Sequence, residues 1–162
     1  NNYNEPLTAI LGGSKVSDKI KVIEKFIEIA DNIIIGGAMS NTFIKSIGGS
    51  IGNSLYEENK LSDALNILDN AKKNNVQIFL PIDSRCSMSL IKGDVLIFKS
   101  NSIKENYSSY DIGPESVKIF DKIRFSKNDT VEKITLELNK ILEKMIMMNP
   151  SQWIWTHNRW KI

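Results

Sequence analysis

Short apolar runs that end in paired glycines constrain the fold of this chain more than any other feature. The run LTAIL, residues 7–11, is followed by the pair Gly12–Gly13, and the run NIII, residues 32–35, is followed by the pair Gly36–Gly37. Each run has the length and composition of a buried strand, and each precedes apolar residues at helical spacing. The sequence therefore predicts strand, glycine turn and helix, twice in succession.

A third unit of the same kind follows these two. Residues 61–73 carry apolar side chains at helical spacing, and VQIFLPID, residues 76–83, predicts a strand that Pro81 stops. Strands that alternate with helices predict an α/β fold, a three-layer parallel sheet with helices on both faces and right-handed crossovers. Between residues 84 and 110 the signal weakens, and only DVLIF, residues 94–98, indicates a further strand.

A helical pattern resumes at Pro114 and again beyond residue 124. Pro114 suits the first position of a helix, and the candidate buried residues after it are Val117, Ile119, Phe120 and Ile123. Farther on, an apolar stripe at three- and four-residue steps from Ile134 to Met148 predicts a C-terminal amphipathic helix that ends at Pro150. Three Trp, one His, one Arg and one Lys crowd the last ten residues.

Composition excludes several function classes. With 21 basic against 19 acidic residues the net charge is only +2, too balanced for nucleic acid or an anionic membrane to be the main partner. A single cysteine, Cys86, rules out an internal disulfide framework, and we expect a reducing, cytoplasmic compartment. The first residues, NNYNEP, include no Met and no apolar signal core, so we expect the chain to begin inside a longer protein.

The first glycine turn has the chemistry of an anion site. In a parallel α/β sheet, ligands bind beyond the carboxyl ends of the strands, where helix N-termini present free N–H groups. Gly12–Gly13 would let a ligand approach the backbone, and Lys15 and Lys19 would add two ammonium groups, which suits a polyphosphate. The spacing matches neither the P-loop nor the dinucleotide fingerprint, so a plain tight turn with solvated lysines stays an open alternative. Gly36–Gly37 would lie beside this turn and approach a flat ligand such as an adenine ring.

Several motifs together carry a family resemblance. In order and spacing, AILGGSKVSDKIKVIEKF, IIIGGAMSNTF, GNSLYEENK, LPID and DIGPESVKIF resemble the nucleotide-binding half of phosphoglycerate kinase, over about residues 6–123. The resemblance implies a Rossmann-like half, truncated, of an enzyme of glycolysis. That family transfers a phosphoryl group between 1,3-bisphosphoglycerate and MgADP, giving 3-phosphoglycerate and ATP.

The resemblance also implies roles for individual residues. Lys19 would hold the nucleotide phosphates, and Lys15 would be catalytic by stabilising the phosphoryl group in transfer. Five residues would border the adenosine, namely Gly12, Gly13, Ser14, Gly36 and Gly37. The cofactor would be ADP or ATP with Mg²⁺ that the nucleotide brings, with no metal ligand from the protein. The family's phosphoglycerate-binding domain and its magnesium-binding turn are absent from this sequence, so we expect a catalytically incomplete chain.

The end of the chain resembles another family. The segment ITLELNKILEKMIMMNPSQWIWTHNRWK resembles the C-terminal end of the lipid A acyltransferases, from about residue 124 to the last residue. The expected domains are therefore 1–123, kinase-like, and 124–162, a helix with a Trp-rich tail. Aromatic and basic residues together suit a membrane interface. His157 lacks the acidic partner of that family's catalytic motif, so we assign it no catalysis.

Three hypotheses of function stand at this point. The first is a phosphoglycerate kinase fragment that binds nucleotide. The second is a non-enzymatic remnant or interaction module, with weak membrane-surface contact through the tail or self-association into a homo-oligomer. The third, acyl transfer to lipid A, ranks last because its catalytic motif is missing.

Overall fold

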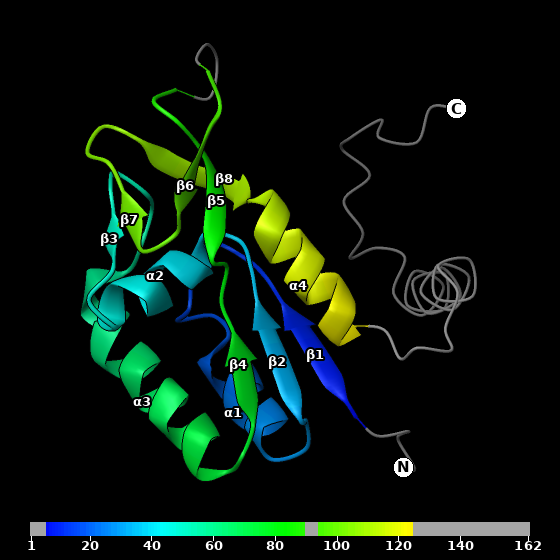
Figure 1. Ribbon diagram of the computed structural model, residues 1–162. Helices are drawn as coiled ribbons and strands as arrows, with labels where there is room; N and C mark the ends of the chain where they lie inside the picture. The colour runs from blue at the N-terminus through cyan, green and yellow to red at the C-terminus, as the bar shows by residue number, and fades with distance from the viewer. Residues whose placement is uncertain (1–5, 90–93, 125–162) are drawn as a thin grey trace, which may run out of the picture. The chain divides into compact units, whose positions relative to one another are not determined.

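The computed structural model describes residues 6–89 and 94–124, which fold into the expected mixture of helices and strands (Figure 1). The described residues all belong to one compact unit, which ends at Arg124. Besides a short 3-10 turn at Glu58–Lys60, the elements in chain order are β1 (Thr8–Leu11), α1 (Ile20–Ile27), β2 (Asn32–Ile35), α2 (Met39–Ser46), β3 (Ser50–Ile51), α3 (Leu61–Lys73), β4 (Gln77–Phe79), β5 (Asp83–Ser87), β6 (Leu96–Lys99), β7 (Ser102–Ile103), β8 (Ser108–Ile112) and α4 (Pro114–Arg124).

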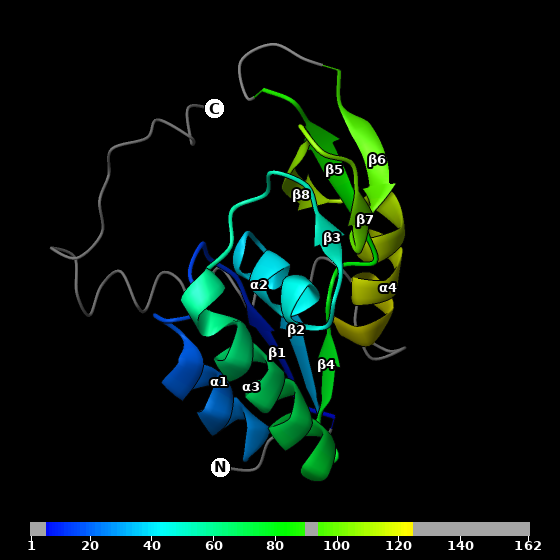
Figure 2. The same ribbon diagram turned by 90° about the vertical axis from the view of Figure 1, so that its left-hand side faces the viewer.

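A parallel sheet with strand order β1-β2-β4 is the centre of this unit. Leu11 pairs with Ile35 and Ile34 pairs with Phe79, so the carboxyl ends of the three strands lie at one edge. In Figure 2, α1 and α3 lie on one side of these strands and α4 lies on the other. The α/β class with a parallel sheet and helices on both faces is therefore confirmed.

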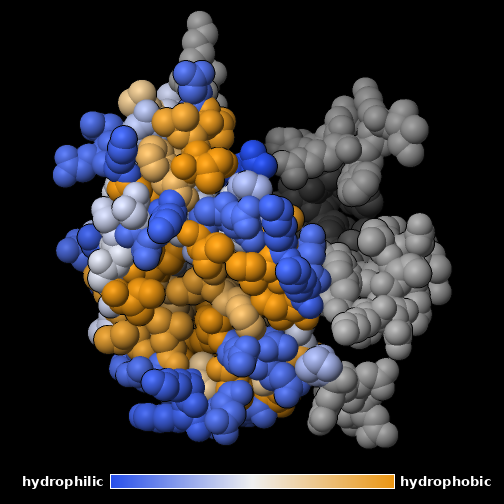
Figure 3. All heavy atoms as spheres, in the orientation of Figure 1, coloured by the Kyte–Doolittle hydropathy of each residue, from blue (hydrophilic) through white to orange (hydrophobic). Residues whose placement is uncertain are grey.

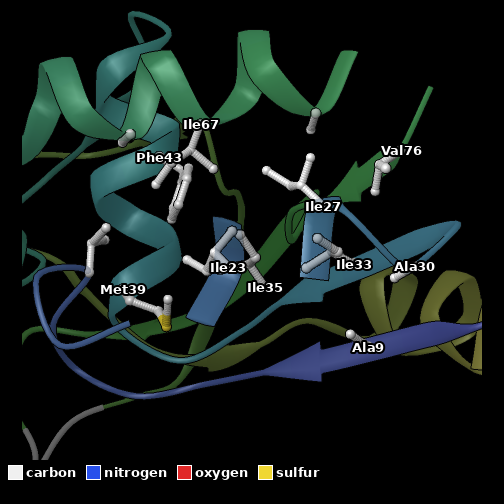
Figure 4. Packing of buried hydrophobic residues seen from close by; sticks show 13 residues of the cluster. Ala9, Ile23, Ile27, Ala30, Ile33, Ile35, Met39, Phe43, Ile67 and Val76 are labelled. Atoms are coloured by element: carbon white, nitrogen blue, oxygen red, sulfur yellow. The ribbon is translucent and has the colours of Figure 1, made fainter. Parts of the chain in front are cut away.

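The hydrophobic core lies between the sheet and helices α1, α2 and α3. Alternate residues of each strand point into it, and they meet Ile23 and Ile27 of α1 and Phe43 of α2 (Figure 4). Ile23, Ile33, Ile35 and Phe43 have no exposed surface. The helical periodicity of the sequence thus predicted the faces that build this core.

An antiparallel sheet, β6-β5-β8, was not expected from the sequence. Its central strand, β5, reads DSRCS, and four of its five residues are buried although most are polar. The buried polar groups pair inside the protein, as when the Ser84 and Ser100 hydroxyls meet at 2.7 Å. Hydrogen bonds satisfy the buried polar groups of this strand, and its sequence has no alternation of apolar and polar residues. Hydrophobic patterning could therefore not reveal it. A further parallel pair, β3 with β7, was also not predicted.

Two burial predictions were wrong. The strand β1 was expected to be buried throughout, but it lies at the edge of its sheet and Ile10 is 55% exposed. Val117 lies on the outer face of α4, so its side chain faces solvent. Helix α4 does begin at Pro114, as predicted.

The predicted amphipathic helix between Ile134 and Met148 and the Trp-rich tail lie outside the described residues, so both stay predictions. Among the residues that the structure does describe, none of the helices has the length and apolar character needed to cross a membrane.

Candidate functional site

The two glycine turns meet at the carboxyl edge of the parallel sheet. The Gly36 N–H donates to the Leu11 carbonyl at 2.8 Å, and the Met39 N–H donates to the Gly13 carbonyl at 2.9 Å. A Cβ placed on Gly37 would lie 2.7 Å from the Gly13 oxygen, closer than side chains approach backbone in proteins. The expectation that these turns are spatial neighbours is therefore met, and only glycine allows their approach at residue 37.

Lys15 and Lys19 have different neighbours at the first turn. The backbone of Lys19 precedes α1, and its Cε lies 3.9 Å from the position that a Cβ on Gly13 would occupy. Its side chain therefore runs beside the exposed glycine turn. Lys15 is exposed, and its charge acts on the carboxylate of Glu57. Within the described part of the chain, neither ammonium group forms an ion pair, so both are free to meet an anion.

Ser14, Gly12 and Gly36 complete the residues that the sequence singled out. Ser14 and Gly12 are exposed and Gly36 is half-buried, all around the same turn. A Cβ on Gly12 would be 3.9 Å from the Gly36 oxygen, which is ordinary contact. The structure thus brings all seven candidate residues to one edge of one sheet. Their roles toward a ligand stay predictions.

A pocket of about 320 Å³ opens beside Gly37. It lies where the parallel sheet meets β5 and β8, which Figure 1 shows beyond the carboxyl ends of β2 and β4. Its lining is mixed, with apolar side chains and several hydroxyl groups. The lining residues are Gly37, Ala38, Ser40, Asn53, Leu55, Pro81, Ser84, Ser108, Ser109, Tyr110, Asp111 and Ile112. Gly37 therefore borders both the lysine-bearing turn and the pocket.

Sequence reasoning missed most of this pocket. Leu55 and Tyr110 fall within or beside motifs that were noticed, GNSLYEENK and DIGPESVKIF, but nothing local marks them as site residues. The fold brings Tyr110 to Gly37 because β8 pairs with β5, which directly follows the loop after β4. Leu55 is held beside α2, where its carbonyl accepts a hydrogen bond from the Asn41 side chain.

The Cys86 thiol of β5 is buried. Burial raises the pKa of the Cys86 thiol to about 11, so it stays protonated at neutral pH and is not a nucleophile. Among the described residues, no three His, Cys, Asp or Glu side chains gather closely enough to hold a metal ion. The geometry suits binding of an anionic ligand through backbone and ammonium groups.

Comparison with known proteins identifies the family of the chain. A family model described as phosphoglycerate kinase matches residues 1–132. The chain belongs to the phosphoglycerate kinase family. Its relatives include phosphoglycerate kinase of Finegoldia magna, 43% identical over 131 residues that make up 80% of this chain and 33% of that protein. Another is phosphoglycerate kinase of Wolinella succinogenes, 41% identical over 74% of this chain and 30% of the relative.

Solved structures of phosphoglycerate kinases share the fold. The Coxiella burnetii structure superposes with a TM-score of 0.73 at 35% identity, over 75% of this chain and 32% of that one. The Pyrococcus horikoshii structure gives a TM-score of 0.61 at 25% identity, over 74% and 31%. The chain thus spans about a third of the length of the phosphoglycerate kinases that it matches.

A second family model, described as bacterial lipid A biosynthesis acyltransferase, matches residues 104–162. Its first part overlaps the phosphoglycerate kinase match and covers β8 and α4, which belong to the compact unit described above. The remainder covers residues outside the described part of the chain.

Proposed function

We propose that residues 1–123 are the nucleotide-binding half of a phosphoglycerate kinase and bind ADP or ATP with Mg²⁺ at the glycine turns. The observation that carries this proposal is the position of Gly37, which borders both the pocket and the turn beside Lys19. A nucleotide has the same two parts, a flat base with a sugar and a charged phosphate chain. The pocket offers apolar walls and hydroxyl groups to the first, and the turn offers N–H groups and ammonium charge to the second.

The two lysines have separate proposed roles. Lys19 lies at the start of α1, where its charge adds to the partial positive charge of the helix N-terminus and would hold the nucleotide phosphates. Lys15 is more exposed and would reach the phosphoryl group as it transfers, neutralising the charge that develops there. Mg²⁺ would arrive with the nucleotide and supply further charge neutralisation at the phosphates.

Phosphoryl transfer requires both substrates to be positioned at once. The chain spans about a third of the length of the phosphoglycerate kinases that it matches, so we propose that these residues by themselves bind nucleotide without turnover. The family reaction, transfer between 1,3-bisphosphoglycerate and ADP in glycolysis, belongs to a protein that has both halves. A cytoplasmic location is part of this proposal, because the substrates of glycolysis are small phosphorylated metabolites.

A second candidate function concerns residues 124–162, which we propose as a separate acyltransferase-like segment. The match of a lipid A acyltransferase model to residues 104–162 and the Trp, Arg and Lys side chains of the tail favour peripheral contact with a membrane surface. Such a module would be non-enzymatic, alone or as a homo-oligomer.

The nucleotide proposal is tested by calorimetric titration of MgADP into the purified chain. We expect saturable binding by the wild-type chain. In Lys19→Ala the affinity for MgADP should fall by about tenfold or more, because a charge-assisted contact with phosphate contributes roughly 1.5–3 kcal/mol. Lys21→Ala is the matched control, since Lys21 is an exposed lysine two residues farther along α1 and should leave the affinity unchanged. A folded chain that shows no saturable MgADP binding would refute the proposal.

A further inference from the structure

A carboxylate distant in the sequence holds the segment that carries both site lysines. The Ser17 N–H donates to Oε2 of Glu57 at 3.0 Å, and the Ser17 hydroxyl donates to Oε1 of the same carboxylate at 2.7 Å. Ser17 lies between Lys15 and Lys19, next to the fully buried Val16. Both carboxylate oxygens of Glu57 therefore accept hydrogen bonds from the middle of this segment, although Glu57 lies 40 residues from Ser17 in the sequence.

Glu57 is itself fixed to the helix that follows the second glycine turn. Its N–H donates to the Thr42 hydroxyl at 3.1 Å, and Thr42 is fully buried in α2. Two residues earlier, the Leu55 carbonyl accepts a hydrogen bond from the Asn41 side chain at 3.1 Å. Because α2 begins two residues after Gly37 and its Ser40 lines the pocket, Glu57 connects the lysine segment to a helix that borders the pocket.

The carboxylate is ionised at neutral pH. Desolvation raises the pKa of Glu57, but hydrogen bonds from the Ser17 side chain and from the Ser17 and Val16 backbone, together with the charge of Lys15, outweigh it and hold the pKa below its ordinary value. Hydrogen bonds to an ionised acceptor are the strong class, so the contact resists thermal opening better than a neutral one.

We propose that Glu57 is a positioning residue that sets the Lys15–Lys19 segment against the nucleotide phosphates. Its effect would be exerted through Ser17, because the carboxylate is engaged by that segment. The inference rests on the proposed function, since it assigns to Glu57 the alignment of the lysines that would bind phosphate. Because the segment is held at its middle, the Lys19 side chain stays beside Gly13. The segment is then ordered before the ligand binds, which lowers the entropic cost of binding.

Electrostatics alone predicts the opposite outcome for loss of Glu57. A negative charge near Lys15 repels a phosphate anion, so its removal should strengthen binding if charge were its only effect. A positioning role predicts weaker binding of phosphate-bearing ligands. A role in overall stability predicts that the affinity for every ligand falls to a similar extent, whether or not the ligand carries phosphate. The three roles therefore differ in the sign and selectivity of one measurement.

The test compares the affinities of MgADP and adenosine by calorimetry in Glu57→Ala, Ser17→Ala and Ser17→Thr. We expect Glu57→Ala to lower the affinity for MgADP by about tenfold and Ser17→Ala to lower it by less. Neither variant should change the affinity for adenosine, which has no phosphate. Ser17→Thr keeps the hydroxyl and should restore wild-type MgADP affinity. Glu58→Ala is the matched control, because it removes the same charge from the adjacent, exposed position and should leave both affinities unchanged.

Each alternative result is decisive. Unchanged or tighter MgADP binding in Glu57→Ala, with binding by the wild type, would overturn the positioning role and leave the proposed function standing. Parallel loss of MgADP and adenosine would overturn it in favour of a purely structural role. If Glu57→Ala does not fold, as judged by circular dichroism, the contrast of Ser17→Ala with Ser17→Thr decides in the same way. No MgADP binding by the wild-type chain would overturn both proposals together.

Discussion

Gly37 occupies the most constrained backbone position of the candidate site. Its φ is +66°, which L side chains rarely adopt, and the space that a Cβ would need is taken by the backbone of Gly13. Gly13 also has a positive φ, +146°. The contact between the turns is therefore built from backbone alone, and a single added carbon would separate them.

Gly37→Ala should lower the free energy of unfolding by about 2–4 kcal/mol, as the sum of left-handed strain and collision with Gly13. Urea denaturation measures this. Gly12→Ala is the first control, because its Cβ would meet nothing closer than 3.9 Å, and we expect a loss under about 1 kcal/mol. Gly48→Ala is the second, with φ +89° and open space, and should cost only the strain of about 1–2 kcal/mol. If Gly37→Ala and Gly12→Ala lowered the free energy of unfolding equally, the close approach of Gly37 to Gly13 would be contradicted.

Among the elements, α4 depends on a residue from β5. The Asp83 carboxylate accepts the Glu115 N–H at 3.0 Å and the Ser116 N–H at 2.8 Å, so it caps the helix from outside the helix's own sequence. The Ser116 hydroxyl donates to Asp83 Oδ1 at 2.6 Å. Gly113 packs against the same carboxylate, which leaves no room for a Cβ there. One side chain thus connects the antiparallel sheet to α4.

Asp83→Asn should lower the free energy of unfolding by about 1–3 kcal/mol at pH 7, because a buried, charge-assisted cap is weakened. Desolvation raises the pKa of Asp83, but hydrogen bonds from Ser116 and from the helix backbone hold it below its ordinary value of 3.8. A lowered folded-state pKa means that the stabilisation is complete above pH 3.8 and is lost as the pH falls through the folded value.

The difference between wild type and Asp83→Asn should therefore shrink in acid, as urea denaturation from pH 7 down to pH 2 would show. Asp69→Asn, at an exposed position on α3, is the control and should match the wild type throughout. A difference that stays constant with pH would show that the charge of Asp83 does not support the cap.

For the described part of the molecule as a whole, exposed apolar side chains lie at the edge of the parallel sheet and in the loop that follows it. Ile10, Ile34 and Phe79 pair in one row on the face away from the main core, where Ile34 is only 2% exposed but Ile10, on the edge strand, is 55% exposed. Ile82 is 52% exposed. Figure 3 shows apolar residues gathered over the described unit in this view, between bands of hydrophilic ones. A patch of this kind is a surface on which further protein can pack.

If the tail contacts membranes, the full chain should co-sediment with vesicles that contain anionic phospholipid, and deletion of residues 152–162 should abolish this. The physical reason is that indole rings settle at the headgroup level while Arg and Lys meet phosphate. Vesicles of neutral phospholipid are the control and should retain less protein. Identical sedimentation of the full and shortened chains would refute membrane contact through the tail.

The sequence predicted those site residues that lie close together along the chain and missed those that only the fold brings together. Gly12, Gly13, Lys15 and Lys19 lie within eight residues and could be recognised together. Leu55 and Tyr110 could not, because Leu55 reaches Gly37 through its contact with α2 and Tyr110 through the pairing of β8 with β5. The exposure of Ile10 was also beyond prediction, since an apolar strand looks the same in sequence whether it lies at the centre or the edge of a sheet.

By itself the sequence determined the α/β class, the positions of β1, β2 and β4, the two glycine turns and the family. These depend on periodicity, turn chemistry and motif order, all of which are local along the chain. Only the tertiary structure decided that a polar antiparallel sheet forms beside the parallel one, that Glu57 grips Ser17 and that Asp83 caps α4. Those features pair residues that lie from 10 apart, as Cys86 and Leu96, to 40 apart, as Ser17 and Glu57. Buried polar groups find such partners through the fold and not through any pattern in the sequence.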